Sequence, residues 1–338
     1  MPTPTPRRDL VVRGILYMLA MAIPTSVSLI CNEPEVLVLG ALGALFALFI
    51  APRYKPLPRT LCISAGGLLV CMAGAVGVFT QGNNNLALIP LVMFSWLAAL
   101  PRPDQAYLSL VFKNMGTAAL LTHFGMTSSI SAAAIYMTGL ALGATLSVLG
   151  IRFGSGQGSG ASPFEEFKAF KHGAVNNPLF GMAVPATVLL CTLAAGGLHF
   201  SHPAWVGLTV LFVMHSDGAT ELRRIRDRAL GTVVGVIAAA PLVFYISSPL
   251  PLAACVFCAA LFIPYAQRGH YMLFSFIITL IVLLLIDMAT LRMGGDISLL
   301  RWRLLDTILA CGGVLISNLI LRLIASRLNR NKKLENTV

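Results

Sequence analysis

Six ionisable side chains lie inside or at the ends of long apolar runs. Their side-chain groups could bind ions or exchange protons. A charge within a membrane segment costs about 2.5 to 3.5 kcal/mol on insertion scales, so such a residue marks a functional site by default. Their types predict anion binding and proton exchange. The six residues are Lys113, His215, Asp217, Asp287, Arg303 and Asp306.

Lys113 lies in the apolar run 106–122, and Asp287 lies near the end of the run 270–290. A lysine ammonium can hold an anionic substrate as a point charge. Alternatively, Lys113 pairs with Asp287 as a structural lock between two parts of the bundle. A desolvated carboxyl group can exchange protons near neutrality, so Asp287 is a candidate for proton coupling. The alternative interpretation is that Asp287 is solvated at the membrane boundary.

The stretch from His215 to Gly235 is the most distinctive in the sequence. Asp217 can cap a helix, and the basic helix that follows it runs into the next apolar run. Gly231 and Gly235 form a small-xxx-small pair, which permits close approach of another helix. The four arginines of this helix are interpreted as anchors facing anionic lipid, with a funnel for cytosolic anions as the alternative. They are Arg223, Arg224, Arg226 and Arg228.

Arg303 and Asp306 open the last apolar run, three residues apart on one helix face. That spacing is typical of an intrahelical ion pair. The alternative is a functional pair, with Arg303 contacting a substrate carboxylate. Aromatic rings that would suit an aromatic substrate, or that serve only in packing, are Phe112, Phe274 and Phe276.

These residues are embedded in a strongly apolar chain of 338 residues, of which 57% are hydrophobic and 11% charged. The mean hydropathy is +0.82. Soluble domains are about 25% charged, so the chain is an integral membrane protein. The apolar segments are continuous and do not alternate with period two, which excludes a transmembrane barrel. A secreted enzyme and a cytosolic nucleic-acid binder are excluded as well.

The fold class predicted from these segments is all-α, a polytopic bundle of about twelve transmembrane helices. Several segments are short for a full crossing and are broken, re-entrant or lengthened by inward-facing polar residues. The predicted spans are 14–31, 35–51, 60–79, 86–100, 106–122, 129–150, 179–198, 203–215, 229–247, 250–266, 270–290 and 303–325.

The net charge is +11, and the positions of the basic residues predict how the chain is oriented in the membrane. With both termini placed in the cytoplasm, twenty lysines and arginines fall on the cytoplasmic side and three on the opposite side. This split agrees with the positive-inside rule and with an even number of crossings.

Local matches indicate an internal repeat. Pro34 and Gly66 match Pro203 and Gly235 at a constant offset of 169, and Tyr107 matches Tyr271. We therefore expect two six-helix halves, inserted the same way up and related by an axis along the membrane normal. The expected domains are a first repeat at 1–152, a cytoplasmic linker with a short amphipathic helix at 153–178, a second repeat at 179–326 and a cytoplasmic tail at 327–338.

Enzymatic motifs are missing from the sequence. The glycines at 154–160 lack the Lys-Ser/Thr ending of a phosphate-binding loop, and HExxH, GxSxG and zinc-spaced His/Cys clusters do not occur. We expect no enzyme activity, no cofactor and no metal.

One longer pattern resembles a known family. An apolar span follows Pro203-x-Trp205, and the last span opens with Arg303-x-x-Asp306. Between them stand the motif residues Asp217, Thr220, Arg228, Gly231, Thr232 and Gly235. This pattern is similar to the fusaric acid resistance and aromatic acid exporter family, most specifically over 203–325. Plant aluminium-activated malate channels are related in general plan.

The resemblance implies a bacterial inner-membrane exporter of aromatic or other small organic acids, driven by the proton gradient and working with a periplasmic membrane-fusion adaptor. The expected partners are the organic acid, protons, membrane lipid, the adaptor and a second copy of the chain, with no nucleic acid. Lys113 and Arg303 would contact the carboxylate, with Asp287 and His215 linked to protons. The alternatives are a gated organic-anion channel and a docking subunit of an efflux complex.

Overall fold

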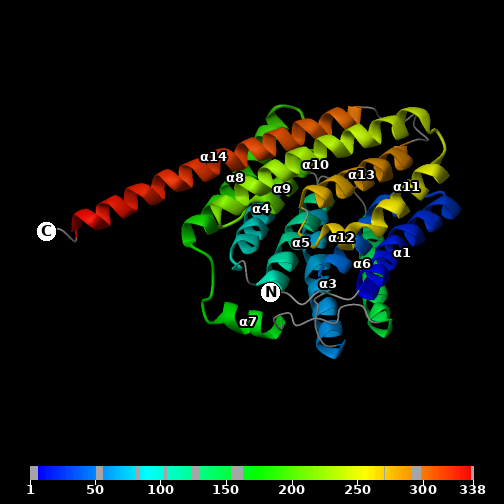
Figure 1. Ribbon diagram of the computed structural model, residues 1–338, viewed down its shortest axis with the longest axis horizontal. Helices are drawn as coiled ribbons and strands as arrows, with labels where there is room; N and C mark the ends of the chain where they lie inside the picture. The colour runs from blue at the N-terminus through cyan, green and yellow to red at the C-terminus, as the bar shows by residue number, and fades with distance from the viewer. Residues whose placement is uncertain are drawn as a thin grey trace.

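The computed structural model describes residues 7–50, 56–80, 84–102, 105–123, 130–153, 163–269, 271–290 and 298–335. Within them the chain is a bundle of helices (Figure 1). In chain order these are α1 (Arg7–Cys31), the π-helix η1 (Val36–Gly40), α2 (Ala41–Ile50), α3 (Pro56–Phe79), α4 (Asn84–Ala99), α5 (Ala106–His123), α6 (Ile130–Arg152), α7 (Pro163–Lys171), α8 (Pro178–Gly197), α9 (Pro203–Val213), α10 (Gly218–Tyr245), α11 (Pro249–Leu261), α12 (Ile263–Ala266), α13 (Tyr271–Thr290) and α14 (Ser298–Glu335).

Among the described residues, seven helices are long and apolar enough to cross a membrane. This is fewer than the twelve crossings expected, because the apolar parts of the other segments are shorter. The seven segments are Arg7–Cys31, Leu61–Phe79, Pro178–Gly197, Gly218–Tyr245, Pro249–Ala266, Tyr271–Thr290 and Ser298–Ile324. Shorter apolar helices span Val36–Ile50, Leu88–Ala99, Ala134–Gly150 and Pro203–Val213.

Several helix boundaries differ from the prediction for local reasons. The span predicted to start at 229 belongs to a helix that starts at Gly218, because Asp217 caps that helix and its basic first turns are helical too. The segment 250–266 breaks into α11 and α12 at Phe262, directly before Ile263-Pro264, since proline cannot continue the hydrogen-bond ladder. The predicted tail is helical as far as Glu335. The glycine-rich linker at 154–160 lies outside the described residues.

Helix pairs in the two parts of the chain pack in matching ways. α3 lies against α5 as α10 lies against α13, and α2 lies against α6 as α9 lies against α14. α3 and α6 are neighbours, as are α10 and α14. Across the two parts, α4 packs on α8 and α11 packs on α1. The longest helix, α14, runs past the body of the bundle to the C-terminal end (Figure 1).

The apolar core joins helices that are distant in sequence. One buried cluster brings Tyr17 and Met21 of α1 together with Leu252 of α11 and Ile281 of α13. A second cluster joins α4, α8, α9 and α14. Burial of these side chains against each other fixes the first and last thirds of the chain side by side.

The two motif glycines of α10 bring its backbone onto α13. A Cβ atom at Gly231 would lie 2.5 Å from the carbonyl oxygen of Met272, and one at Gly235 would lie 2.9 Å from Cβ of Thr279. Such contacts leave no room for a side chain. The small-xxx-small pair is therefore used within the chain, and it sets the rotation of α10 about its axis.

Replacing Gly231 with alanine should destabilise the fold by roughly 1–3 kcal/mol, as overpacking of tight cores does. Gly312 on α14 is the matched control, since a Cβ there meets nothing within 4 Å. Alanine at 312 should leave stability unchanged or raise it by up to about 1 kcal/mol through helix propensity. Thermal unfolding of both purified variants in the same detergent measures the difference; equal melting temperatures would contradict the close contact.

Candidate functional site

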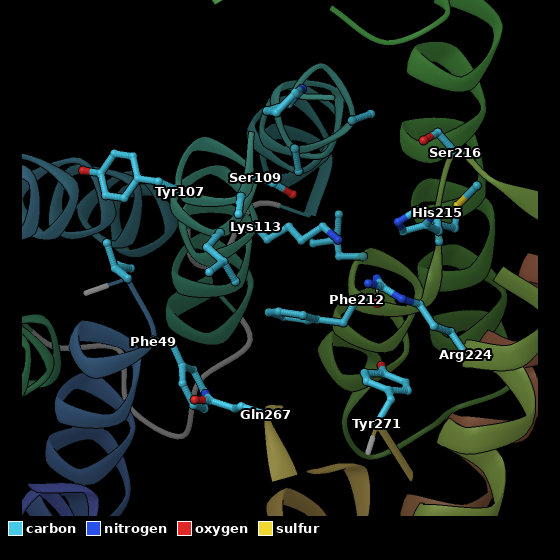
Figure 2. A pocket seen from close by; sticks show the side chains of 18 of the residues that line it. Phe49, Tyr107, Ser109, Lys113, Phe212, His215, Ser216, Arg224, Gln267 and Tyr271 are labelled. Carbon is cyan, nitrogen blue, oxygen red and sulfur yellow. Dashed lines mark hydrogen bonds between the residues drawn. The ribbon is translucent and has the colours of Figure 1, made fainter. Parts of the chain in front are cut away.

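A cavity of about 760 Å³ lies where many helices meet at one end of the bundle. Its walls come from the C-terminal ends of α2, α4, α9 and α12 and from the N-terminal parts of α5, α8, α10 and α13. Figure 2 shows Lys113 reaching from α5 toward the wall that carries Phe212, His215 and Arg224. The cavity thus lies between helices of the first and second parts of the chain.

Three basic side chains line this cavity, namely Lys113, Arg224 and Arg13. The ammonium of Lys113 lies 5.9 Å from the centroid of the Phe212 ring, and the guanidinium of Arg224 lies 5.6 Å from that of Tyr271. In the described part of the chain, ion pairs form between Arg226 and Asp227 and between Arg268 and Asp9, and no carboxylate there lies within 4.0 Å of Lys113 or Arg224. The cavity therefore carries an excess of positive charge.

Aromatic side chains supply much of the apolar wall. Phe49, Phe180, Phe212, Phe274 and Tyr271 all line the cavity. Rings beside cations are the surroundings that a flat organic anion needs, because the ring buries apolar area while the cation meets the charged end.

The aromatic residues chosen from the sequence lie only partly here. Phe274 lines the cavity as expected. Phe112 instead stacks edge-on against Phe170 of α7, with ring centroids 5.9 Å apart, and Phe276 packs into the apolar core. These two residues serve in packing, the alternative that the sequence left open.

The carboxylate of Glu166 also lines the cavity, but it is engaged. Its Oε2 atom accepts hydrogen bonds from the backbone N–H groups of Tyr107, at 3.0 Å, and Leu108, at 3.2 Å. Glu166 thus ties the amphipathic helix α7 to the first turn of α5, where a carboxylate is favoured by the helix dipole. Helix α7 covers Pro163–Lys171, within the linker predicted at 153–178.

Polar contacts hold the rest of the cavity rim. Nη2 of Arg13 donates to Oε1 of Gln267 at 3.1 Å, which ties α1 to the turn before α13. The other terminal nitrogen of Arg13 is buried and has no hydrogen-bond partner among the described residues. Asn176 donates to the carbonyl oxygens of Ala99 and Pro101, so the segment before α8 is fixed beside the end of α4.

His215 stands in the connection between α9 and α10, on the cavity wall. Burial, together with the charges of Arg224 and Lys113, lowers the pKa of His215 to about 4. The backbone N–H of Asp217 donates to its Nδ1 atom at 3.1 Å. His215 is therefore a neutral, polar wall residue at physiological pH, and its role as a proton carrier there loses support.

Asp217 caps α10. Its Oδ2 atom accepts hydrogen bonds from the side-chain hydroxyl of Thr220 and, at 3.0 Å, from the backbone N–H of Thr220. These hydrogen bonds lower the pKa of Asp217 below its ordinary value, so the carboxylate stays ionised. The motif Asp217-x-x-Thr220 thus starts the helix that carries Arg224, and neither residue lines the cavity.

Asp287 is buried near the opposite end of α13 from the cavity, and its Oδ2 atom has no partner among the described residues. Since Lys113 lies at the cavity end, the two residues do not form the structural lock considered above. His123 ends α5, and its Nδ1 atom lies 3.1 Å from the hydroxyl of Thr80.

Arg303 and Asp306 belong to a second polar group inside the bundle. Both are buried, and the guanidinium carbon of Arg303 lies 5.0 Å from the Trp205 ring centroid. They do not form the intrahelical ion pair that their spacing indicated, since no such pair occurs among the described residues within 4.0 Å. Arg228 and Thr232 of α10 are buried on the adjacent helix.

Comparison with known proteins supports the resemblance noted in the motifs. Residues 189–317 match the family described as "Fusaric acid resistance protein-like". Over these residues the chain is similar to that family. The segment holds α9 to α13 entirely, with His215, Arg224 and Tyr271 of the cavity and the Arg303–Asp306 group. Lys113 and Arg13 lie outside it.

Two curated proteins are similar to this chain. An uncharacterised protein of Haemophilus influenzae (strain ATCC 51907 / DSM 11121 / KW20 / Rd) is 33% identical over 144 residues, which are 41% of this chain and 19% of the relative. The inner membrane protein YccS of Escherichia coli (strain K12) is 30% identical over 148 residues, 42% of this chain and 19% of the relative. The chain thus spans about a fifth of the length of these relatives. No solved structure matches it significantly.

The cavity includes basic residues for which the sequence favours other roles. Arg224 was interpreted as a lipid anchor, yet it points into the cavity (Figure 2). The helical spacing could have distinguished Arg224 from the neighbouring arginines. Residues 224, 228, 231 and 235 fall on one helix face, whereas residues 223 and 226 fall on another. Arg13 and Glu166 carried no comparable signal, since each reaches the cavity through tertiary packing.

The low pKa of His215 makes a prediction about stability. Because the folded chain protonates His215 only near pH 4 and the unfolded chain near 6.5, the unfolded state binds this proton first as the pH falls. Acidification through that window should destabilise the wild type more than His215→Gln. Melting temperatures of both proteins at pH 7.5 and 5 test this; identical losses on acidification would show that His215 titrates normally.

Proposed function

We propose that this protein is a bacterial inner-membrane carrier that exports small organic acids, aromatic carboxylates above all, from the cytoplasm. The observation that carries the proposal is the cavity with three basic side chains, one engaged carboxylate and aromatic walls. The family match over 189–317 and the similarity to an inner membrane protein support it independently.

The cavity suits a small anion in size and in chemistry. Its volume of about 760 Å³ falls in the range of about 300–1,000 Å³ typical of small-molecule sites. Lys113 and Arg224 point into the same space from opposite walls, so one carboxylate could meet both (Figure 2). The neutral imidazole of His215 adds a hydrogen-bonding group without further charge.

The proposed architecture is two six-helix halves with twelve crossings, related by an axis along the membrane normal. The matching helix neighbours on either side of α7 support it, because α3 packs on α5 as α10 packs on α13, and α4 packs on α8 as α11 packs on α1. The cavity then lies between the halves, where Tyr107 and Tyr271 are equivalent wall residues. The proposed division at 153–178 separates the halves.

The positive-inside rule supports an orientation in which the cavity opens toward the cytoplasm and both termini are cytoplasmic. The helix ends around the cavity are those flanked by the basic residues, including Arg102, Lys168 and Arg268. An anion would then enter from the cytoplasm, attracted by the positive potential of the opening.

Packing beyond the cavity favours a carrier over an open channel. On α13, Ile277, Ile281 and Leu284 lie between the cavity residue Phe274 and the far end of the helix, and all three are buried in the core. Passage through this region requires a second conformation, as in alternating access. The proton gradient is the proposed driving force, and a periplasmic adaptor and a second chain copy are the proposed partners.

Lys113→Ala should abolish most of the uptake of a labelled benzoate into inside-out vesicles. Loss of a charge-assisted contact removes roughly 1.5–3 kcal/mol, which weakens binding by about 10- to 100-fold. The apparent KM is the quantity to measure, with Lys168→Ala on exposed α7 as the control of equal charge loss. An unchanged KM in Lys113→Ala would remove this residue from the site. Flux that follows voltage without a pH gradient would instead indicate a channel.

Arg224→Gln and Arg223→Gln form a matched pair on one helix. Both remove one positive charge at the same end of α10, yet only Arg224 lines the cavity, and Arg223 is exposed. We expect a KM raised about tenfold in Arg224→Gln alone. Equal effects on KM, or an effect on membrane insertion alone, would return Arg224 to the role of a lipid anchor.

A further inference from the structure

A second buried polar group lies one helix turn beyond the cavity, inside the part of the chain that matches the family. Its members are Arg228 and Thr232 on α10 and Arg303 and Asp306 on α14. Arg228 is 7% exposed, Arg303 5% and Asp306 0%. Arg228 follows the cavity residue Arg224 by one turn, so the group is continuous with the anion site along α10.

The register of α10 and α14 places these residues at the same level. The helices run antiparallel, with Asn318 donating to Glu221 at 2.7 Å and the Cys311 thiol donating to the carbonyl oxygen of Ile225 at 3.9 Å. One turn further along α10, Arg228 therefore comes beside the turn of α14 that holds Asp306.

Asp306 is unusual because it is buried without a partner. Both carboxyl oxygens have no hydrogen-bond partner among the described residues, and neither has Nε of Arg303. The Thr232 hydroxyl is likewise buried and unsatisfied among those residues. An ionised carboxylate buried in this way is costly unless a cation or donor meets it. The observed arrangement therefore fits the neutral acid.

The guanidinium of Arg303 can contact either of two groups, the Trp205 ring or the Asp306 carboxyl. In the structure its guanidinium lies over the Trp205 ring, 5.0 Å from the centroid. Asp306 lies three residues further along α14, within reach of the same side chain for an i,i+3 ion pair. Loss of a proton from Asp306 would draw Arg303 from the ring to the carboxylate, so the proton decides which contact forms.

We infer that Asp306 is the group that binds and releases the coupling proton, with Arg303 as the positioning residue that responds to it. The inference deepens the proposed function and rests on it for the transport step. Asp306 takes a proton from water on one side of the membrane and returns it to water on the other. The carrier without bound anion reorients with Asp306 neutral.

Other titratable groups lie on the helices packed around Asp306. On α10 these are Arg228 and Glu221, and on α8 Cys191 packs against Gly313 of α14. On α14 itself Cys311 lies one turn beyond Asp306. On the α9 side His202 stacks on Trp205, with ring centroids 4.5 Å apart. His202 could also report pH through Trp205, so the experiment must separate the two.

The transport test uses Asp306→Asn, which mimics the neutral acid. Because the carrier with neutral Asp306 is the form that reorients without bound anion, we expect both gradient-driven accumulation and counterflow exchange of labelled benzoate to be lost. Benzoate should still raise the melting temperature of purified Asp306→Asn but not that of Lys113→Ala, so coupling and binding are distinguished. Gradient-driven accumulation that persists in Asp306→Asn, or one that is lost in Asp287→Asn with Asp306→Asn unaffected, would overturn the inference.

A second measurement needs no substrate and decides the claim even where benzoate is not carried. In the background Trp96→Phe, Trp302→Phe, Trp205 is the one remaining tryptophan. Its fluorescence in purified protein should show a pH transition as Arg303 moves. The transition should vanish in Asp306→Asn and persist in His202→Gln. A transition that survives Asp306→Asn, disappears in His202→Gln or is absent in the parent overturns the assignment to Asp306.

Discussion

The contact between the backbones of α10 and α13 is the constraint on which the site depends. Because Gly231 and Gly235 admit no side chain against α13, the rotation of α10 is fixed. At about 100° per residue, Arg224 falls between these two glycines on the helix face, and Arg228 falls about 60° from Gly231. The same geometry turns Arg223 and Arg226 outward. One pair of glycines thus separates two inward arginines from two outward ones.

Charge and burial follow from that placement. Arg224 meets Tyr271 at the start of α13 and faces Lys113 across the cavity (Figure 2). Arg228 is buried inside the bundle, on the helix next to the one that carries Arg303 and Asp306. A membrane protein keeps such groups away from lipid, where they mark the path of an ion or a substrate. The two polar groups lie one helix turn apart along α10, and the proposed transport mechanism uses both.

The sequence predicted the class of fold because its signals are local. Continuous apolar runs, the Asp217 cap and the glycine pair each act within a few turns, and each appears in the structure as expected. Tyr107 and Tyr271, which the predicted repeat relates, both line the cavity, although the sequence did not predict that role. Lys113 was found from its type alone, since a lysine in an apolar run stands out.

The rest required tertiary packing that no local signal carries. Arg13 and Glu166 reach the cavity from α1 and α7, which are far from α5 in sequence. The spacing of Arg303 and Asp306 indicated an ion pair, but the Trp205 ring of α9 offers Arg303 another contact. Asp287 stood out as strongly as Lys113, yet it lies at the far end of α13. The position of a residue along its helix, more than its type, determines whether its side chain lies at the cavity.

The most direct test of the account is access to the cavity from one side of the membrane. Ser109 lines the cavity, so a cysteine placed there should react with a membrane-impermeant thiol reagent in inside-out vesicles. The account predicts fast labelling that benzoate slows, and little labelling in right-side-out vesicles. Labelling mainly from the outside, or labelling that benzoate does not slow, would contradict a cytoplasm-facing anion site.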